Sequence, residues 1–347
     1  MRIAIDAMGG DLGPAAVIGG VAAFLRDDTD TEIAMVGREE ILGPELRRHG
    51  LDSHPRVSVR PASQVIEMDE KLSAIRQKQD ASVLRTVELV RDGQADAAVL
   101  VGNTAAAVAA SQLRLRLVEG AHRAGIAVPL PSKSGNTVVI DMGANTSPKI
   151  EHYVDYAIMA SIYVEEVLGK PRPRVGLINV GEESGKGDEL LREAYSRLEQ
   201  APINFIGNVE GGDIYRGTCD VAVCDGLVGN AILKSSEAAA ELMVSFLKEE
   251  LSRSLRRRLG ALLCKGAFRD LWRRCDYAEF GGAPLLGVNG VVIKGHGRSD
   301  ARAVRNAIRV ARDAAARGVT RKIRERLASL VPARGGPAEA QGVSGHG

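Results

Sequence analysis

The sequence predicts an α/β protein in which a mostly parallel sheet is covered by helices on both faces. Apolar strand candidates alternate with longer helical patterns along the chain, as in such folds. Most strand candidates run directly into a short polar turn that contains glycine. The length of 347 residues suits two domains or one large unit, and we expect a single large α/β unit over residues 1–331.

The individual elements follow from local composition. Strands are expected where apolar, β-branched residues occur together: 2–6, 33–36, 57–60, 97–101, 138–142, 175–180, 203–206, 221–225 and 291–294. Helices are expected where apolar residues recur at helical spacing: 15–25, 84–92, 105–117, 154–168, 189–199, 230–251 and 301–327. Residues 332–347 contain five glycines and almost no large apolar side chain, so we expect a disordered tail there.

Composition excludes several classes of protein. The 46 Lys and Arg residues nearly balance the 44 Asp and Glu residues, so no overall field draws the chain to nucleic acid. Aromatic residues make up only 3% of the chain, too few to stack on single-stranded nucleic acid. Asp6 interrupts the first apolar stretch, which argues against a signal peptide, and no apolar run approaches the ~18 residues of a spanning helix. We expect a soluble protein.

The cysteines indicate neither a disulfide scaffold nor a zinc site. The chain contains four of them, too few for a disulfide scaffold, and no CxxC pair suggests zinc. We therefore expect a reducing compartment. No metal site and no cofactor are predicted for the chain, and whether a metal assists is left open. Cys224 lies in a strand candidate and is expected to be a small buried apolar residue.

Six glycine-bearing turns are the most informative local feature. They lie at 7–14, 102–104, 143–145, 181–187, 207–213 and 226–230. In an open parallel sheet such turns share the carboxyl edge, where backbone amides and helix N-termini can hold an anion. A single turn of this kind is more often a cap, but six in one sheet favour a phosphate-bearing ligand. Residues 181–186 lack the Lys-Ser or Lys-Thr ending of a P-loop, and no strict GxGxxG follows the first strand.

A set of ordered sequence blocks is more specific than any one turn. The blocks are IDAMGGD with Gly13-Pro14, Asp69-Glu70-Lys71 with Ala74-Ile75-Arg76, GLINVGEE (176–183) with Lys186-Gly187 and Glu189-Leu190, FIGNVEG (205–211), CDG (224–226) with Gly229-Asn230 and Lys234, Tyr277 with GGAPLLG (281–287), and HGRS (296–299). In this order they resemble the PlsX-type phosphate acyltransferases of bacterial phospholipid synthesis. The resemblance covers residues 1 to about 310, nearly the whole expected fold.

The resemblance implies a three-layer α/β/α fold related to isocitrate dehydrogenases and phosphotransacetylases, usually as a homodimer. It also implies a reaction in which inorganic phosphate and acyl-[acyl carrier protein] give acyl phosphate and free carrier protein. The product would feed a glycerol-phosphate acyltransferase. The expected location is cytoplasmic, with peripheral membrane association.

The chain departs from the family pattern at several positions. Leu72 and Ala124 stand where the family usually has proline, Ala105 replaces a glycine, and Leu100-Val101 replace Ser-Ala. Gly212 stands where arginine is common, which removes a possible anion contact.

The expected chemistry needs positioning more than a strong base. Phosphate is already ionised at neutral pH, and a thiol with a pKa near ~8.5 leaves easily. The task is to hold a dianion against the thioester carbonyl and to stabilise the oxyanion. No GxSxG elbow suggests a covalent acyl-enzyme.

Candidate site residues follow from that task. The expected catalytic groups are Lys186, Asn230 and Lys234 as charge or oxyanion partners and His296 as proton manager. The expected phosphate or substrate-binding residues are Gly9, Gly10, Gly102, Asn103, Thr104, Asn208 and Ser299, with Asp6, Asp11 and Asp225 orienting them. Alternatively, the two lysines are solvated cations at helix ends, and His296 caps the next helix.

A basic, apolar insert at about 251–276 stands apart from this scheme. Residues 251–275 contain eight Arg or Lys and one Asp. Apolar residues at helical spacing form its candidate contact surface: Leu255, Leu259, Leu262, Leu263, Phe268 and Trp272. Such cationic amphipathic helices suit an anionic membrane surface, an acidic carrier protein or a second subunit, and the sequence leaves these open. The arginines at 302, 305, 309 and 312 are expected to be the solvated face of the last helix.

Two further functions remain as alternatives. One is an NAD-dependent decarboxylating dehydrogenase on a related fold, which would require a cluster of metal-binding aspartates in the C-terminal part of the chain. The other is a non-catalytic, membrane-associated scaffold, for which Gly212 is the best argument.

Overall fold

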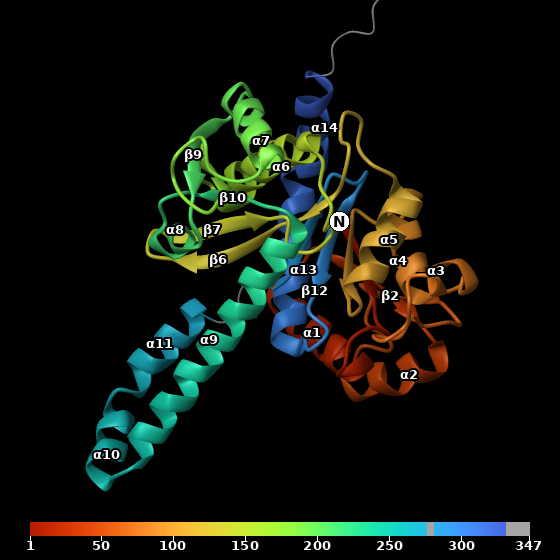
Figure 1. The fold of residues 1–347 in the computed structure, drawn as a ribbon. Coiled ribbons are helices and arrows are strands. Elements are labelled where there is room, and N and C mark those ends of the chain that lie inside the picture. The colour runs from red at the N-terminus through yellow and green to blue at the C-terminus, as the bar shows by residue number, and fades with distance from the viewer. Residues whose placement is uncertain (276–280, 331–347) are drawn as a thin grey trace, which may run out of the picture.

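The structure, a computed structural model, describes residues 1–275 and 281–330. Within these residues the strands form two sheets, ordered β3-β2-β1-β4-β12-β11-β5 and β6-β7-β10-β8-β9, with helices on their faces (Figure 1). The mostly parallel α/β architecture is confirmed. The prediction of one sheet is wrong, because the periodicity of a strand does not reveal which strand it pairs with.

The strands have these bounds: β1 Arg2–Asp6, β2 Glu32–Gly37, β3 Val57–Pro61, β4 Ala97–Val101, β5 Gly125–Ile126, β6 Val128–Ser132, β7 Gly135–Ile140, β8 Arg174–Ile178, β9 Asn204–Val209, β10 Val221–Val223, β11 Ala283–Leu286 and β12 Val291–Gly295. The helices have these bounds: α1 Gly13–Asp27, α2 Glu39–Arg48, α3 Ala74–Gln77, α4 Ser82–Arg91, α5 Thr104–Leu115, α6 Ile150–Leu168, α7 Glu189–Glu199, α8 Gly211–Arg216, α9 Gly226–Ser252, α10 Leu255–Leu263, α11 Lys265–Cys275, α13 Ala301–Ala316 and α14 Val319–Ala328.

The first sheet, β3-β2-β1-β4-β12-β11-β5, is parallel from β3 to β12 and ends in two antiparallel pairings, β12 with β11 and β11 with β5. One face packs on α1 and α13 through buried residues such as Ile5, Val99 and Ile293. The other face packs on α4 and α5 through Ala98 and Val292. These are three layers of helix, sheet and helix.

The second sheet, β6-β7-β10-β8-β9, is parallel except for the edge strand β6. Its outer face packs on α6 and α7, whereas Val139, Ala222 and Cys224 on the other face join the same core as Leu100 of the first sheet. The chain passes between the sheets at Ala127, which separates β5 from β6. The two sheets therefore share a core, and the carboxyl ends of both can contribute to one site.

Several boundaries differ from the sequence predictions for physical reasons. β6 was not predicted because Pro129 and Pro131 cannot donate ladder hydrogen bonds, but an edge strand tolerates them. The predicted helix 301–327 is two helices, because Gly318 adopts a φ of 64° between α13 and α14. Arg312 is not simply solvated, since its Nη1 lies 3.0 Å from Asp28 Oδ2.

The basic insert is part of a longer arm. α9 runs unbroken for 27 residues away from the body, α10 lies at the tip, and α11 runs back toward the body (Figure 1). Exposed apolar residues occur on α9 before residue 251, at Met243 and Phe246. The bounds of the insert, at about 251–276, stay a prediction. No helix among residues 1–275 and 281–330 is both long enough and apolar enough to cross a membrane. Tyr277 and the predicted tail at 332–347 lie outside the described residues.

Candidate active site at the meeting of the two sheets

The turns after β1, β4 and β12 pack against one another at the carboxyl edge of the first sheet. The N–H of Asp11 donates a hydrogen bond to the carbonyl of Gly297 at 2.7 Å. A Cβ on Gly102 would lie 2.9 Å from the nitrogen of Gly10, and a Cβ on Gly9 would overlap the carbonyl oxygen of Val101. Gly10 and Gly102 also have φ values of 87° and 123°. These glycines are required because the turns approach so closely, which gathers their backbone amides at one edge.

Asp6 lies beneath these turns at the end of β1. Only 4% of its surface is exposed, and its Oδ1 accepts the N–H of Met8 at 3.2 Å. Burial raises the pKa of Asp6 to about 6, and the hydrogen bonds from Ser82, Met8 and Gly9 partly oppose that shift. These hydrogen bonds tie the carboxylate to the β1 turn, and the orienting role of Asp6 toward a phosphate site stays a prediction.

Asn103 and Thr104 begin α5 beside the Gly102 turn. Asn103 Oδ1 caps the helix by accepting the N–H of Ala106 at 3.0 Å. Asn103 Nδ2 donates to the carbonyl of Met68 at 3.1 Å and also faces the carbonyls of Glu67 and Glu70. Because its side chain already holds the 67–70 loop, Asn103 supports the edge rather than offering a free amide to a ligand. Thr104 is half-buried at the first position of the helix.

The second sheet contributes turns that seat α9. Asp141 follows β7, is fully buried, and accepts the N–H groups of Ile126, Ala144 and Asn145 at 2.7 to 3.1 Å. Burial raises the pKa of Asp141, and these hydrogen bonds partly oppose that shift. A Cβ on Gly229 would overlap the carbonyl oxygen of Asp141. Glycine at this position lets the first turn of α9 rest directly on the end of β7.

Asp225 and Asn230 occupy that first part of α9. Asp225 is the N-cap, and its Oδ1 accepts the N–H groups of Leu227 and Val228 at 2.8 and 2.9 Å. Asn230 is exposed on the following turn, and a Cβ on Gly143 would lie 3.7 Å from Asn230 Cβ. The structure therefore places Asn230 over the turn that follows β7, as a surface donor.

Lys234 and His296 join the two halves of this edge. Lys234 Nζ on α9 lies 3.4 Å from His296 Nε2 in the turn after β12. The same ammonium lies 2.8 Å from Glu237 Oε2, one turn further along α9. Residues 62 positions apart in sequence thus meet where the second sheet's helix crosses the first sheet's edge. The predicted helix-capping role for His296 is wrong, because Asp300 caps α13 by accepting the N–H of Ala303.

Lys294 is a site residue that sequence reasoning missed. It is the fourth residue of β12, two positions before His296, and burial lowers its pKa to about 8, with Lys234 adding repulsion. Burial also lowers the pKa of His296, and the charges of Lys294 and Lys234 lower it further. The available signal was a lysine inside an otherwise apolar strand. A cluster of cations therefore faces an edge already rich in backbone amides, which is suited to an anion.

Lys186 lies on a separate loop of the second sheet, and Asn208 lies in a strand beside that loop. Asn208 is not in a turn but inside β9, because that strand continues to Val209. Its Nδ2 donates to the carbonyl of Glu183 at 2.7 Å, and Asn179 Nδ2 donates to the carbonyl of Lys186 at 3.0 Å. Lys186 itself is exposed, with Nζ 3.8 Å from Glu183 Oε2. Asn208 thus positions the loop that carries Lys186.

The space beside Gly212 is filled by another arginine. A Cβ on Gly212 would lie 2.8 Å from Arg216 Nη1, and the same nitrogen lies 3.4 Å from Asp213 Oδ1. The departure from the family pattern therefore leaves a guanidinium at this surface, supplied from one turn later in α8.

Ser299 and Asp11, two other predicted site residues, lie at the same edge of the first sheet, and Cys224 lies beneath the site. Ser299 is 4% exposed, and its N–H donates to the carbonyl of His296 at 3.0 Å. Asp11 is exposed at the mouth of the first-sheet edge. Cys224 is buried beneath the site, which confirms the structural role expected of it, and burial raises the pKa of its thiol.

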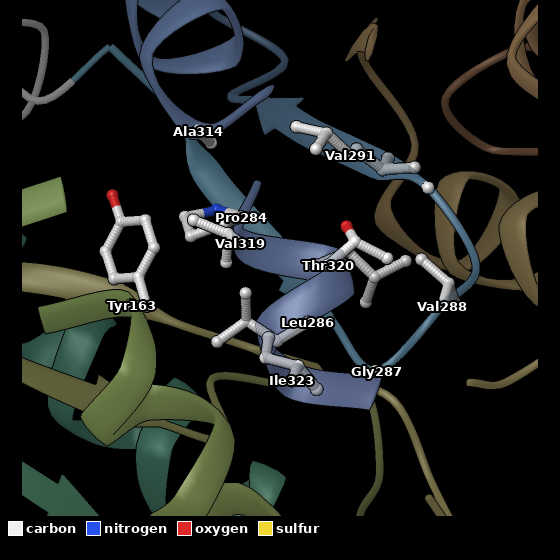
Figure 2. Close-up of a pocket in the computed structure, with 13 residues that line it drawn as sticks. Tyr163, Pro284, Leu286, Gly287, Val288, Val291, Ala314, Val319, Thr320 and Ile323 are labelled. Carbon is white, nitrogen blue, oxygen red and sulfur yellow. The ribbon is translucent and has the colours of Figure 1, made fainter. Parts of the chain in front are cut away.

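A small apolar cavity lies elsewhere, between α6, α14 and the β11–β12 region (Figure 2). Its walls include Tyr163, Leu286 and Ile323, and its volume of about 10 Å³ suffices for about one water. It contains none of the charged groups described above. It is a packing defect of the core and not part of the candidate site.

Comparison with known proteins gives the class first. The fold resembles that of a phosphotransacetylase from Streptococcus pyogenes, with a TM-score of 0.61, 16% identity, and coverage of 91% of this chain and 94% of that one. It also resembles a branched-chain phosphotransacylase from Enterococcus faecalis, with a TM-score of 0.56, 14% identity, and coverage of 90% and 99%. The fold class is thus that of the phosphotransacetylases.

The family follows from sequence. Residues 1–322 match the family model described as "Fatty acid synthesis protein". The chain is 45% identical over 332 residues to a phosphate acyltransferase of Heliobacterium modesticaldum, covering 95% of this chain and 99% of that protein. It is 45% identical to a phosphate acyltransferase of Desulforudis audaxviator, covering 90% and 92%. The chain therefore belongs to the PlsX-type phosphate acyltransferase family, and it is an acyl-transferring enzyme.

Proposed function

We propose that this enzyme transfers the acyl group of an acyl-[acyl carrier protein] to inorganic phosphate in phospholipid synthesis. The observation that carries the proposal is the approach of Lys234 to His296 at the point where the turns of both sheets meet. Cations and glycine-turn amides at one edge suit phosphate, and curated relatives of high identity are named phosphate acyltransferases.

The reaction balances without a covalent enzyme intermediate. An oxygen of HPO₄²⁻ attacks the thioester carbonyl carbon and forms a C–O bond. The tetrahedral intermediate then collapses, and the C–S bond breaks. The thiolate leaves with the carrier protein and takes up the proton released by phosphate. The enzyme must hold the two substrates together and stabilise the negative charge on the carbonyl oxygen.

The proposed roles follow from the placement of each group. The turn amides at Gly10 and Gly102, together with the side chain of Thr104, hold phosphate, and Lys234 and Asn230 face the developing oxyanion. Lys186 approaches the substrate from its own loop. The acyl phosphate is then consumed by an acyltransferase acting on glycerol 3-phosphate.

A direct assay tests the proposal. The purified protein is incubated with long-chain acyl-carrier protein with and without phosphate, and acyl phosphate is trapped with hydroxylamine. Phosphate-dependent product is expected, and the rate should fall at least about 100-fold in Lys234→Ala. The matched control is Lys248→Ala, because Lys248 is an exposed lysine further along α9. Absence of product in the wild-type protein would refute the acyltransferase assignment.

The arm is proposed to place the enzyme on the cytoplasmic membrane surface as a dimer. On α10, Leu255 and Leu263 are 82% and 81% exposed, and three consecutive arginines follow Leu255. Phe268 of α11 is half-buried. The side chain of Trp272 lies outside the described part of the chain. The exposed apolar residues of α9 suit a second copy, and the basic apolar tip suits an anionic bilayer.

Vesicle flotation and molar-mass measurement separate these two contacts. The double variant Leu259→Glu and Leu263→Glu should lose flotation with anionic vesicles while remaining a dimer. The variant Met243→Glu should instead shift the protein toward the monomer. Unchanged flotation in the double variant would refute the membrane contact.

A further inference from the structure

The ring of His296 is oriented by the backbone two residues further along. The N–H of Arg298 donates a hydrogen bond to His296 Nδ1 at 3.1 Å. A backbone N–H can only donate, so Nδ1 must present its lone pair. In the neutral ring the proton therefore resides on Nε2. That same Nε2 lies 3.4 Å from Lys234 Nζ, on the side of the candidate site. Lys234 could donate to Nε2 only in the opposite tautomer, which would set an Nδ1–H against the N–H of Arg298, and the shorter contact from the backbone selects the Nε2–H form. An ammonium has no lone pair, so in this form Nε2–H and Lys234 are not bonded to each other and present two donors on the same side.

The charges around His296 come from three elements. Lys294 precedes it in β12, Lys234 and Glu237 face it from α9, and Arg298 follows it in the turn. Glu237 is the carboxylate in this group, and its Oε2 is paired with Lys234 Nζ at 2.8 Å. Protonation of the ring would therefore add a positive charge among cations, one of which already pairs with the carboxylate.

The strand geometry puts Lys294 on the appropriate side. Side chains two apart in a strand share a face, so Lys294 lies on the same side of the first sheet as Val292. Val292 belongs to the core shared by the two sheets, and Ile232 and Leu233 of α9 pack against that core. Lys294 therefore faces α9, between the shared core and the turn that carries His296. Burial and the neighbouring ammoniums lower the pKa of His296, in agreement with this placement.

We propose that Lys294 is a positioning residue that keeps His296 uncharged with its proton on Nε2, so that His296 donates a hydrogen bond to the oxyanion. The inference rests on the proposed function for the identity of the oxyanion. It gives His296 a donor role in place of the proton-managing role that the sequence suggested. Protonation of the ring would place a second N–H opposite that of Arg298 and break the contact that orients it.

The state of the ring is testable without any activity measurement. In protein labelled with ¹⁵N at histidine, the ring nitrogen shifts should report the Nε2–H form at pH 7 and a pKa below the ordinary 6.5. In Lys294→Met the pKa should rise by about 0.5 to 1 unit, as loss of a nearby partly screened charge requires. Lys294→Arg should restore the wild-type titration, and Lys248→Met should leave it unchanged. An Nδ1–H form, or no shift in Lys294→Met, would overturn the proposal.

The donor role is tested by two substitutions of opposite chemistry. His296→Gln retains an N–H donor but no base, whereas His296→Glu retains a base but no donor at neutral pH. We expect His296→Gln to retain at least about tenfold more acyl-transfer activity than His296→Glu, with His296→Ala reduced by about 100- to 1,000-fold. The reverse order would show that His296 is a base and refute the donor role.

The pH dependence links the two residues. The acid limb of the wild-type kcat profile should lie below pH 6.5 and move upward in Lys294→Met by the same amount as the ring pKa. A wild-type protein that makes no acyl phosphate would refute the proposed function, while the histidine titration would still decide the state of the ring. The two failures are therefore distinguishable.

Discussion

Replacement of Gly229 by alanine tests how α9 is seated on the second sheet. An added Cβ would overlap the carbonyl oxygen of Asp141 and lie 2.9 Å from its carbonyl carbon and 3.2 Å from Cys224 Sγ. Backbone atoms at the end of β7 cannot rotate away as a long side chain does. The first turn of α9 must therefore move, and Asn230 and Lys234 must move with it.

The magnitude follows from two opposing terms. Alanine is favoured over glycine inside a helix by about 1 kcal/mol. Forcing an extra methyl group into a packed interior typically costs about 1–3 kcal/mol, and contact with backbone belongs at the upper end. We expect Gly229→Ala to lower the free energy of unfolding by about 2 kcal/mol. A displacement of about 1 Å at Lys234 should reduce acyl transfer by about 100-fold.

The matched control is Gly260→Ala in α10. An added Cβ at Gly260 would meet nothing within 4 Å. This variant should gain up to about 1 kcal/mol in unfolding free energy and keep full activity. Urea unfolding and the acyl-phosphate assay would be run on both proteins. A Gly229→Ala variant as stable and active as Gly260→Ala would show that α9 is not packed on Asp141 as described.

Three other perturbations give distinct outcomes. Gly212→Arg should change the rate of acyl transfer less than twofold, because Arg216 already supplies a guanidinium at this surface and its flexible end can move aside. If the wild-type protein were inactive and Gly212→Arg restored activity, the result would favour the scaffold alternative. The raised pKa of Asp6 means that the folded state binds its proton more tightly, so stability should fall by about 3 kcal/mol as pH rises from about 3.8 to about 6. Urea unfolding across that range should show no such fall in Asp6→Asn. Asn103→Ala should cost about 1 kcal/mol through loss of the α5 cap and should increase proteolysis of the 67–70 loop; unchanged proteolysis would contradict the tethering.

Local pattern was sufficient for most of the elements but not for their pairing. Alternating strands and helices predict the α/β class because side-chain periodicity reflects burial. The division into two sheets depends on which strands hydrogen-bond, and β5 and β6 differ in sheet although only Ala127 separates them. Single-residue features also decided boundaries, such as Gly318 ending the last long helical pattern early.

The sequence alone therefore determined the family, the glycine turns and the cationic arm, because each is written in short runs of adjacent residues. Only the tertiary structure decided that Lys234 and His296 lie 3.4 Å apart, that Asn103 and Asn208 hold loops, and that Lys294 lies beside the site. These facts arise where α9 of one sheet crosses the edge of the other. The physical reason is that burial and charge at a site depend on contacts between elements far apart in sequence, which local periodicity does not encode.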